Sequence, residues 1–343
     1  MASLTNGSCH ALKWAGGEDA PSTITASDFQ TRTVVAGRFE IIRHLGSGAM
    51  GDVYESEDLQ LRERVALKTL RHGVACKPEM VERFKREVLL GRRVTHPNVC
   101  RIYDFGFDRS EDGTGRPFFT MELLSGETLA TRLKRRPTSE NEALPVILDI
   151  VSALSAVHRL HMVHRDVKSG NVMLTTSGRQ RAVLTDFGLS SIVNAKPKCG
   201  TTRDLTGIAG TIHYMAPEQI RGEDVTPATD IYGLGVVMYE MLTGQRPFAA
   251  PQHSEVLLKH LTQNPLPPSA RAPWLPPKWD SVILTCLRKR PDERFRSAAN
   301  LRTALLSLGP RRSRPKRGGL SGRVLTMQLL QRAPGGPRLL VEY

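Results

Sequence analysis

Two short motifs near the middle of the chain combine residue types that carry out phosphoryl transfer. The first runs from His164 to Asn171 with the sequence HRDVKSGN, and the second is Asp186-Phe187-Gly188, fifteen positions after Asn171. In a loop of this kind the aspartate, Asp166, accepts the proton of the substrate hydroxyl, and the lysine, Lys168, contacts the transferred phosphate. Asn171 and Asp186 would hold Mg²⁺ against the nucleotide. Because the two motifs rarely occur together by chance at this spacing, they predict a phosphotransferase site.

With these motifs the chain resembles the eukaryotic-type (Hanks-type) protein kinases, and it is most similar to the bacterial serine/threonine members. The resemblance extends from about residue 38 to about residue 308. It implies an α+β fold of two lobes: a small β-rich N-lobe with one main helix and a larger, mainly helical C-lobe. We expect a kinase domain over 37–309, with the N-lobe at about 37–122 and the C-lobe at about 125–309. Residues 1–36 are expected to be a flexible extension, and 310–343 a basic tail.

A glycine-rich stretch from Gly46 to Val53 fits the pattern G-x-G-x-x-G-x-V. Glycines allow backbone N–H groups to approach phosphates without interference from side chains. A dinucleotide-binding turn has a similar pattern but must open a helix, whereas this stretch continues toward a second β-like segment that ends at Lys68. We therefore expect a hairpin over the nucleotide. Its expected contacts are Gly46, Ser47, Gly48, Ala49, Met50, Gly51 and Val53.

Lys68 ends the segment VALK, and the resemblance implies that it pairs with the α- and β-phosphates and with a glutamate of the next helix. Apolar residues at helical intervals place that helix at 79–94. Glu87 is the expected partner, and Glu82 is the alternative. Gly91 would occupy a helical position, where glycine costs about 1 kcal/mol relative to alanine. We therefore expect this helix to be loosely docked before phosphorylation.

The stretch Phe118–Leu124 reads as a strand that leads into the connection between the lobes. By resemblance, Met121 guards the back of the nucleotide pocket, and the main chain from Glu122 to Leu124 hydrogen-bonds the adenine. Ordinary core residues would look the same, because a nucleotide pocket is mostly apolar. The residues expected to sandwich the ring are Val53, Ala66 and Met173.

The stretch Gly210–Glu218 ends in A-P-E, which closes the activation segment that begins at Asp186. By resemblance, Glu218 forms a buried bidentate pair with Arg294, and Asp230 braces the catalytic loop from the central helix of the C-lobe. Both roles are structural.

Arg165 directly precedes Asp166, and kinases with this arginine are commonly switched on by a phosphate in the activation segment. A phosphate carries about −1.5 to −2 charges and can order a loop against an arginine. We therefore expect autophosphorylation in this segment. The candidates are Thr201, Thr202 and Thr206, of which Thr206 lies nearest the place where bacterial relatives are modified.

The net charge of +14 is concentrated in the tail, where 310–343 carries eight basic residues and one acidic residue. Such a run is usually a solvated tail, and the alternatives are a contact with acidic partners, with nucleic acid or with an anionic surface. Nucleic acid is disfavoured as a partner because no aromatic residues interleave with the charges.

The chain has features of a cytoplasmic protein. Its longest uncharged apolar stretch, 231–239, has nine residues, whereas a membrane-spanning helix needs about 20. Residues 1–20 lack the apolar core of a signal peptide. The five cysteines form no C-x-x-C pair, which is typical of a reducing compartment.

We therefore expect a bacterial signalling kinase that uses ATP and Mg²⁺ to phosphorylate serine and threonine of proteins, and that self-associates for autophosphorylation in trans. The alternative is a pseudokinase, a nucleotide-binding scaffold without turnover. Such proteins typically lose one of the charged site residues. All four, Lys68, Asp166, Asn171 and Asp186, are present here.

Overall fold

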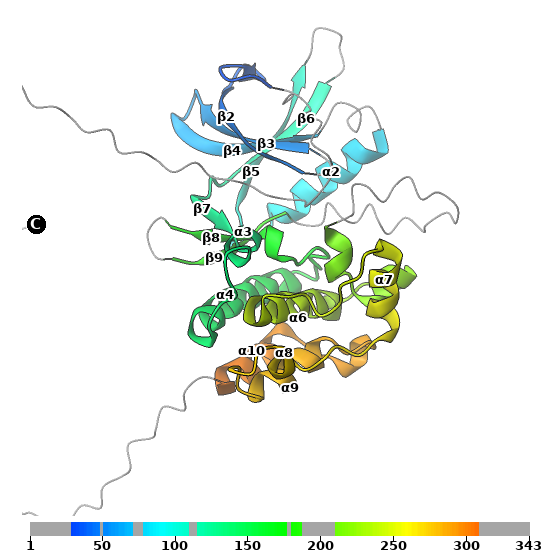
Figure 1. The fold of residues 1–343 in the computed structure, drawn as a ribbon. Coiled ribbons are helices and arrows are strands. Elements are labelled where there is room, and N and C mark those ends of the chain that lie inside the picture. Colours follow the sequence, from blue (N-terminus) through cyan, green and yellow to red (C-terminus); the bar gives the residue numbers. More distant parts are fainter. Residues whose placement is uncertain are drawn as a thin grey trace, which may run out of the picture. The chain divides into compact units, whose positions relative to one another are not determined.

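The computed structural model describes residues 29–48, 51–70, 78–109, 115–176, 180–186 and 210–308 (Figure 1). All of them belong to one compact unit, residues 1–309. Among the described residues, no helix combines the length and the apolar character needed to cross a bilayer.

The N-lobe is built on a six-stranded antiparallel sheet with the strand order β1-β2-β3-β4-β6-β5. Neighbouring residues of a strand point to opposite faces, so Tyr54 and Leu67 lie in one apolar cluster while Val53 and Ala66 lie in another. The strands are β1 (Val34–Val35), β2 (Phe39–Ser47), β3 (Gly51–Asp58), β4 (Glu63–Leu70), β5 (Ile102–Arg109) and β6 (Gly115–Met121).

The main helix of this lobe, α2 (Pro78–Gly91), packs on the sheet face that carries Val53. Gly91 is buried at its end, where a Cβ atom would lie only 2.5 Å from Cδ1 of Ile102 in β5. The Ile102 side chain therefore fills the space that a larger residue at this position would need, and loose docking of the helix before phosphorylation stays a prediction. Glycine there allows the helix to approach the strand closely.

The predicted flexible extension is wrong for residues 29–36, which are part of the lobe. The N–H of Arg32 donates to the carbonyl of Ile41 over 2.7 Å, and β1 pairs with β2. Val35 is fully buried, and the ring of Phe29 contacts that of Tyr54 edge-on. An apolar contact with the outer face of the sheet therefore fixes this segment.

The C-lobe consists of helices and a three-stranded sheet, β7 (Gly126–Thr128), β8 (Val172–Thr175) and β9 (Ala182–Leu184). Its α-helices are α3 (Leu129–Leu133), α4 (Glu140–Arg159), α5 (Pro217–Arg221), α6 (Pro227–Thr243), α7 (His253–Thr262), α8 (Pro268–Arg271), α9 (Lys278–Cys286) and α10 (Ala298–Leu308). Short 3₁₀ turns are η1 (Ser169–Asn171), η4 (Thr211–Tyr214) and η5 (Pro291–Glu293).

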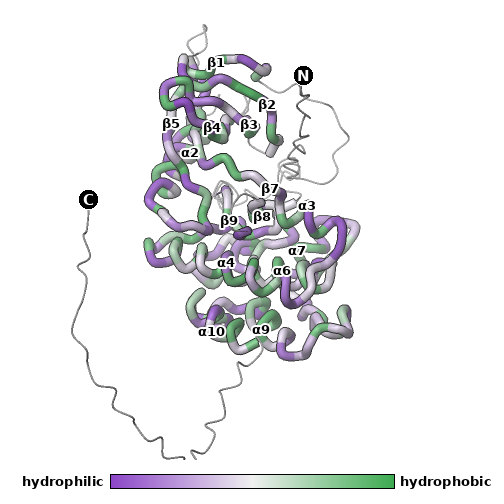
Figure 2. The backbone as a smooth tube through the Cα atoms, turned by 90° about the vertical axis from the view of Figure 1, so that its left-hand side faces the viewer, coloured by the Kyte–Doolittle hydropathy of each residue, from purple (hydrophilic) through white to green (hydrophobic). Residues whose placement is uncertain are grey.

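Helix α6 forms the centre of this lobe. Nearly all its residues are buried, which is typical of a helix surrounded by other elements. Helices α4, α8 and α9 pack against it, and Figure 2 marks hydrophobic residues along α4, α6 and α9. The predicted two-lobed α+β fold is confirmed.

Candidate active site

Asp230 of α6 binds the backbone of the catalytic loop. Its Oδ2 accepts the N–H of His164 over 2.8 Å and lies 2.7 Å from Nε2 of His158, while its Oδ1 accepts the N–H of Arg165 over 2.7 Å. Arg165 has a φ of 69°, a left-handed conformation that is unfavourable for residues other than glycine. The buried carboxylate of Asp230 therefore stabilises a strained turn directly before Asp166.

Asp166, Lys168 and Asn171 lie together at the end of this loop. Nζ of Lys168 is 2.9 Å from Oδ2 of Asp166, and Nδ2 of Asn171 donates to the same oxygen over 2.9 Å. A second bond from Nδ2 reaches the main-chain oxygen of Asp166. The other carboxylate oxygen, Oδ1, is buried and has no hydrogen-bond partner among the described residues. One oxygen of the predicted base is thus fixed, and the other is left to accept a proton.

Lys68 and Asp186 form an ion pair between the lobes. Nζ of Lys68 lies 2.5 Å from Oδ1 of Asp186, although 118 positions separate them. Burial alone would raise the pKa of Asp186, but the ammonium groups of Lys68 and Lys168 outweigh burial and lower it. Asp186 is therefore held in the ionised form, which a metal ligand requires.

The donor atoms near this pair fit Mg²⁺, which prefers oxygen ligands and commonly uses one or two carboxylates together with phosphates. Because Nδ2 of Asn171 donates to Asp166, its amide oxygen points to the other side and can bind a cation. Oδ1 of Asp186 contacts Lys68, so Oδ2 is the corresponding atom there. The described residues contain no cluster of three or more histidine, cysteine or acidic side chains suited to a metal.

The residues predicted to surround the adenine share one apolar cluster that joins the two lobes. Each is buried in it: Val53, Ala66, Met121, Leu124 and Met173. Sequence reasoning missed Leu45 and Val183, which belong to the same cluster. Both residues lie next to predicted site residues in the sequence, because Leu45 directly precedes Gly46 and Val183 lies three residues before Asp186. This proximity could have indicated that they belong to the pocket.

The N–H of Glu122 is bonded within the protein, which leaves its main-chain carbonyl for the predicted contact with adenine. The N–H donates to the carbonyl of Arg101 over 2.9 Å, whereas the Glu122 carbonyl lies 3.8 Å from Sγ of Cys100, a weak contact. The side chain is also fixed, because Oε1 accepts from Nη2 of Arg181 over 2.7 Å. The connection between the lobes is thereby tied to β9, which Arg181 directly precedes.

The glycine-rich stretch is a hairpin and opens no helix, as predicted. Gly46 pairs with Val53 across β2 and β3, and the N–H of Gly48 donates to the carbonyl of Gly51 over 2.8 Å. A Cβ atom at Gly51 would lie 1.7 Å from the carbonyl oxygen of Thr69 in β4. This glycine is therefore required by the neighbouring strand.

Several predicted residues lie outside the description. The side chain of Glu87, on α2, is not described, so its pairing with Lys68 stays a prediction. The same holds for the other residues in this group: Ala49, Met50, Phe187, Gly188, Thr201, Thr202 and Thr206.

The described end of the activation segment is anchored at two points. Nζ of Lys168 donates to Oγ1 of Thr211 over 2.9 Å. Further along, the guanidinium of Arg294 makes two bonds of 2.7 and 2.8 Å to the carboxylate of Glu218. Both side chains are buried, which confirms the predicted pair.

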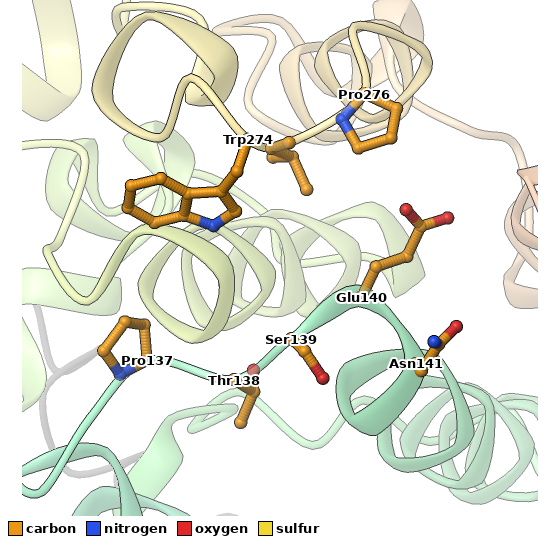
Figure 3. Close-up of a pocket in the computed structure, with 8 residues that line it drawn as sticks. Pro137, Thr138, Ser139, Glu140, Asn141, Trp274 and Pro276 are labelled. Carbon is orange, nitrogen blue, oxygen red and sulfur yellow. The ribbon is translucent and has the colours of Figure 1, made fainter.

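A cavity of about 410 Å³ opens at the other end of the C-lobe, before α4 and before α9. Figure 3 shows Trp274 on one side of it and Pro137 on the other. Helix α4 has 20 residues and is therefore about 30 Å long, and the catalytic loop follows its far end. The cavity is separate from the site of Asp166.

Comparison with known proteins agrees with this geometry. A model of the protein kinase domain family matches residues 39–305. The chain belongs to this family. Among curated relatives, the serine/threonine-protein kinase PknA of Mycobacterium tuberculosis is 37% identical over 293 residues, which cover 84% of this chain and 66% of PknA. PknB of Mycolicibacterium smegmatis is 35% identical over 274 residues, covering 79% of this chain and 43% of PknB.

The crystal structure of the kinase domain of Mycobacterium tuberculosis PknI superposes with a TM-score of 0.63 at 27% identity, covering 81% of this chain and 99% of that domain. The predicted resemblance to bacterial serine/threonine kinases is confirmed. This protein kinase spans just under two thirds of the length of PknA and less than half that of PknB.

Proposed function

We propose that this protein kinase transfers the γ-phosphate of ATP to serine and threonine hydroxyls of proteins. The observation that carries the proposal is the geometry of Asp166, whose Oδ2 is fixed by Lys168 and Asn171 while Oδ1 is buried without a partner among the described residues. A base must be placed within hydrogen-bond reach of the proton that it accepts. Oδ1 is the atom proposed to accept it.

The remaining residues act by position and charge, because phosphoryl transfer depends on electrostatic stabilisation more than on covalent chemistry. Lys168, 2.9 Å from Asp166, would contact the phosphate as it moves to the hydroxyl. Lys68 would hold the α- and β-phosphates. Asn171 and Asp186 would bind Mg²⁺, which when present neutralises charge on the phosphates.

Serine and threonine are the proposed acceptors because Lys168 contacts Thr211, and this pair of residues fits the serine/threonine pattern. The names of the relatives PknA and PknB support the same assignment. A scaffold without turnover is not favoured, since Lys68 and Asp186 are in contact and so are Asp166 and Asn171.

We propose a kinase domain from about residue 29 to residue 309, followed by the basic tail at 310–343. We further propose a cytoplasmic signalling role, self-association for autophosphorylation at Thr206, and contact of the tail with acidic protein partners. These proposals rest on sequence features alone. The short apolar stretches and the cysteine spacing support the cytoplasm, Arg165 and the threonines before Gly210 support autophosphorylation, and the charge of the tail supports acidic partners.

The test is incubation of the purified chain with labelled ATP and Mg²⁺, followed by mapping of phosphorylated residues in a generic protein substrate and in the kinase itself. We expect phosphoserine and phosphothreonine, and a site between residues 187 and 209. Omission of Mg²⁺ should abolish incorporation. Nucleotide binding without any transfer would instead identify a pseudokinase, and phosphotyrosine as the main product would contradict the proposed acceptors.

A further inference from the structure

Ser169 lies in the catalytic loop but takes no part in the contacts of Asp166. Its side chain is 2% exposed, and its Oγ lies 2.8 Å from the phenol oxygen of Tyr214 in η4. The same phenol oxygen lies 2.6 Å from Oε2 of Glu240 in α6. A chain of polar groups therefore runs from the catalytic loop through η4 to the central helix.

The direction of these bonds follows from the groups involved. An ionised carboxylate only accepts, so the single phenol proton of Tyr214 is donated to Glu240. Burial and the Glu240 carboxylate raise the pKa of Tyr214, so the phenol keeps this proton. Ser169 must then be the donor to Tyr214. Arg246, whose Nε is 3.4 Å from Oε1 of Glu240, holds the far end of the chain.

Two neighbouring residues of the catalytic loop thus contact one face of η4. Lys168 donates to Thr211 and Ser169 donates to Tyr214. In a 3₁₀ turn, residues three positions apart eclipse one another, which places Thr211 and Tyr214 on the same face. Lys168 also contacts Asp166, so the segment 210–216 lies beside the approach to the proposed base.

We infer that Ser169 is a positioning residue for the protein substrate, because its hydroxyl fixes Tyr214, and with it the segment 210–216, against the loop that carries Asp166. The inference rests on the proposed kinase activity and assigns a role to a residue next to the reacting groups. Its effect is confined to the protein substrate. The groups proposed to bind nucleotide and Mg²⁺ lie on β2, β3, β4, β6 and β8, in the connection after β6, and at Asn171 and Asp186. Asn171 shares the turn η1 with Ser169, but among the described residues the Ser169 side chain hydrogen-bonds only to Tyr214.

The first test is steady-state kinetics of Ser169→Ala with a peptide substrate. Loss of one buried hydrogen bond should raise the peptide KM by about three- to tenfold, while the KM for ATP stays within about twofold. The matched control is Ser56→Ala in β3, since Ser56 is equally buried and its hydroxyl has no partner among the described residues. A changed ATP KM with an unchanged peptide KM would overturn the inference.

A double-mutant cycle with Tyr214→Phe sharpens this test. Tyr214→Phe removes the same bond from its other side, so Ser169→Ala should raise the peptide KM no further in that background. Ser169→Thr, which keeps a hydroxyl, should restore most of the peptide affinity. Independent, additive effects of the two substitutions would contradict a shared bond.

The second test does not depend on catalysis. Amide hydrogen exchange of the purified chain should become faster in residues 211–216 of Ser169→Ala, while β2 and β4 exchange as in the unaltered protein. If the unaltered protein transfers no phosphate, the proposed function fails, but the exchange result still decides the role of Ser169. Equal exchange in both proteins would overturn the inference, and so would faster exchange throughout the C-lobe, which would indicate only lost stability.

Discussion

The catalytic loop and the nucleotide pocket meet at the ion pair of Lys68 and Asp186, yet they are built from opposite kinds of contact. Polar bonds hold the loop: Asp230 fixes its backbone and Asn171 fixes its base. The pocket is a cluster of apolar side chains from both lobes, among them Val53 and Met173. Hydrogen bonds have narrow geometric requirements, whereas apolar packing adjusts to moderate changes of shape. A single substitution in the catalytic loop should therefore cause a large loss of activity, whereas a single substitution in the pocket should cause a small one.

The largest effect is expected from Asp166→Asn, which keeps the shape of the loop and removes the base. Transfer should fall by about 10² to 10⁴-fold, the range for general-base catalysis, while ATP affinity stays nearly unchanged. The control is Asp224→Asn, at an exposed position after α5. Initial rates and nucleotide titration measure both quantities, and near-normal phosphorylation by Asp166→Asn would refute the assignment of the base.

Among the substitutions considered, Arg294→Met should give the largest loss of stability. The substitution leaves Glu218 buried without its cation, which should lower the unfolding free energy by about 3–5 kcal/mol. Chemical denaturation measures this loss. Arg290→Met, which breaks an exposed pair with Asp292, is the matched control and should have little effect. Equal losses in both variants would mean that burial of the Glu218 pair is unimportant.

The same pair predicts a pH dependence. Burial alone would raise the pKa of Glu218, but its bonds to Arg294 outweigh burial and lower it below the ordinary value of 4.5. The contribution of the pair to the unfolding free energy is therefore complete above about pH 4.5 and is lost as the pH falls through the lowered folded value. Denaturation curves between pH 3 and 6 should show a steeper loss for the unaltered protein than for Arg294→Met.

In the nucleotide region, Gly51→Ala should have a smaller effect than either change above. The added Cβ would meet the Thr69 carbonyl at 1.7 Å, whereas a Cβ at Gly48 has its nearest neighbour at 3.6 Å. Overpacking costs about 1–3 kcal/mol, so the unfolding free energy of Gly51→Ala should fall by about this amount, with Gly48→Ala as the mild control for stability. Chemical denaturation decides the order, and equal unfolding free energies would show that β4 shifts to make room for the extra atom.

Truncation after Gly309 is expected to have the smallest effect. Every proposed catalytic and nucleotide-binding residue lies before Glu218, so peptide kinetics should stay within about threefold, less than 1 kcal/mol. Binding to acidic partners should weaken in a salt-dependent way. A kinetic loss beyond tenfold would instead make the tail part of the catalytic unit.

The sequence was sufficient for features that depend on residue type at fixed spacing. The loop around Asp166, the hairpin at Gly46–Val53 and the pair of Glu218 and Arg294 are of this kind. Each of these features has its own sequence pattern, which can be recognised without knowing which residues it contacts in the fold.

Features that depend on a contact between distant segments could not be predicted. Ser169 and Tyr214 are 45 positions apart, and a serine hydroxyl has too many possible partners for its type to identify one. The packing at Gly91 could not be predicted for a related reason: helix propensity is a weak prior that tertiary packing overrides, and the close approach to Ile102 depends on a strand distant in the sequence. Strand β1 has two residues and carries too little periodicity to be recognised.

At Arg165 the left-handed turn opposes stability to the proposed regulation at a single position. Glycine adopts a φ of 69° with little loss of conformational free energy, whereas a residue with a side chain is destabilised there by about 1 kcal/mol or more. Arg165→Gly should therefore raise the melting temperature and at the same time remove the cation proposed to read the activating phosphate. A laboratory selection for heat resistance alone would therefore favour a more stable enzyme that lacks the cation proposed to bind the phosphate.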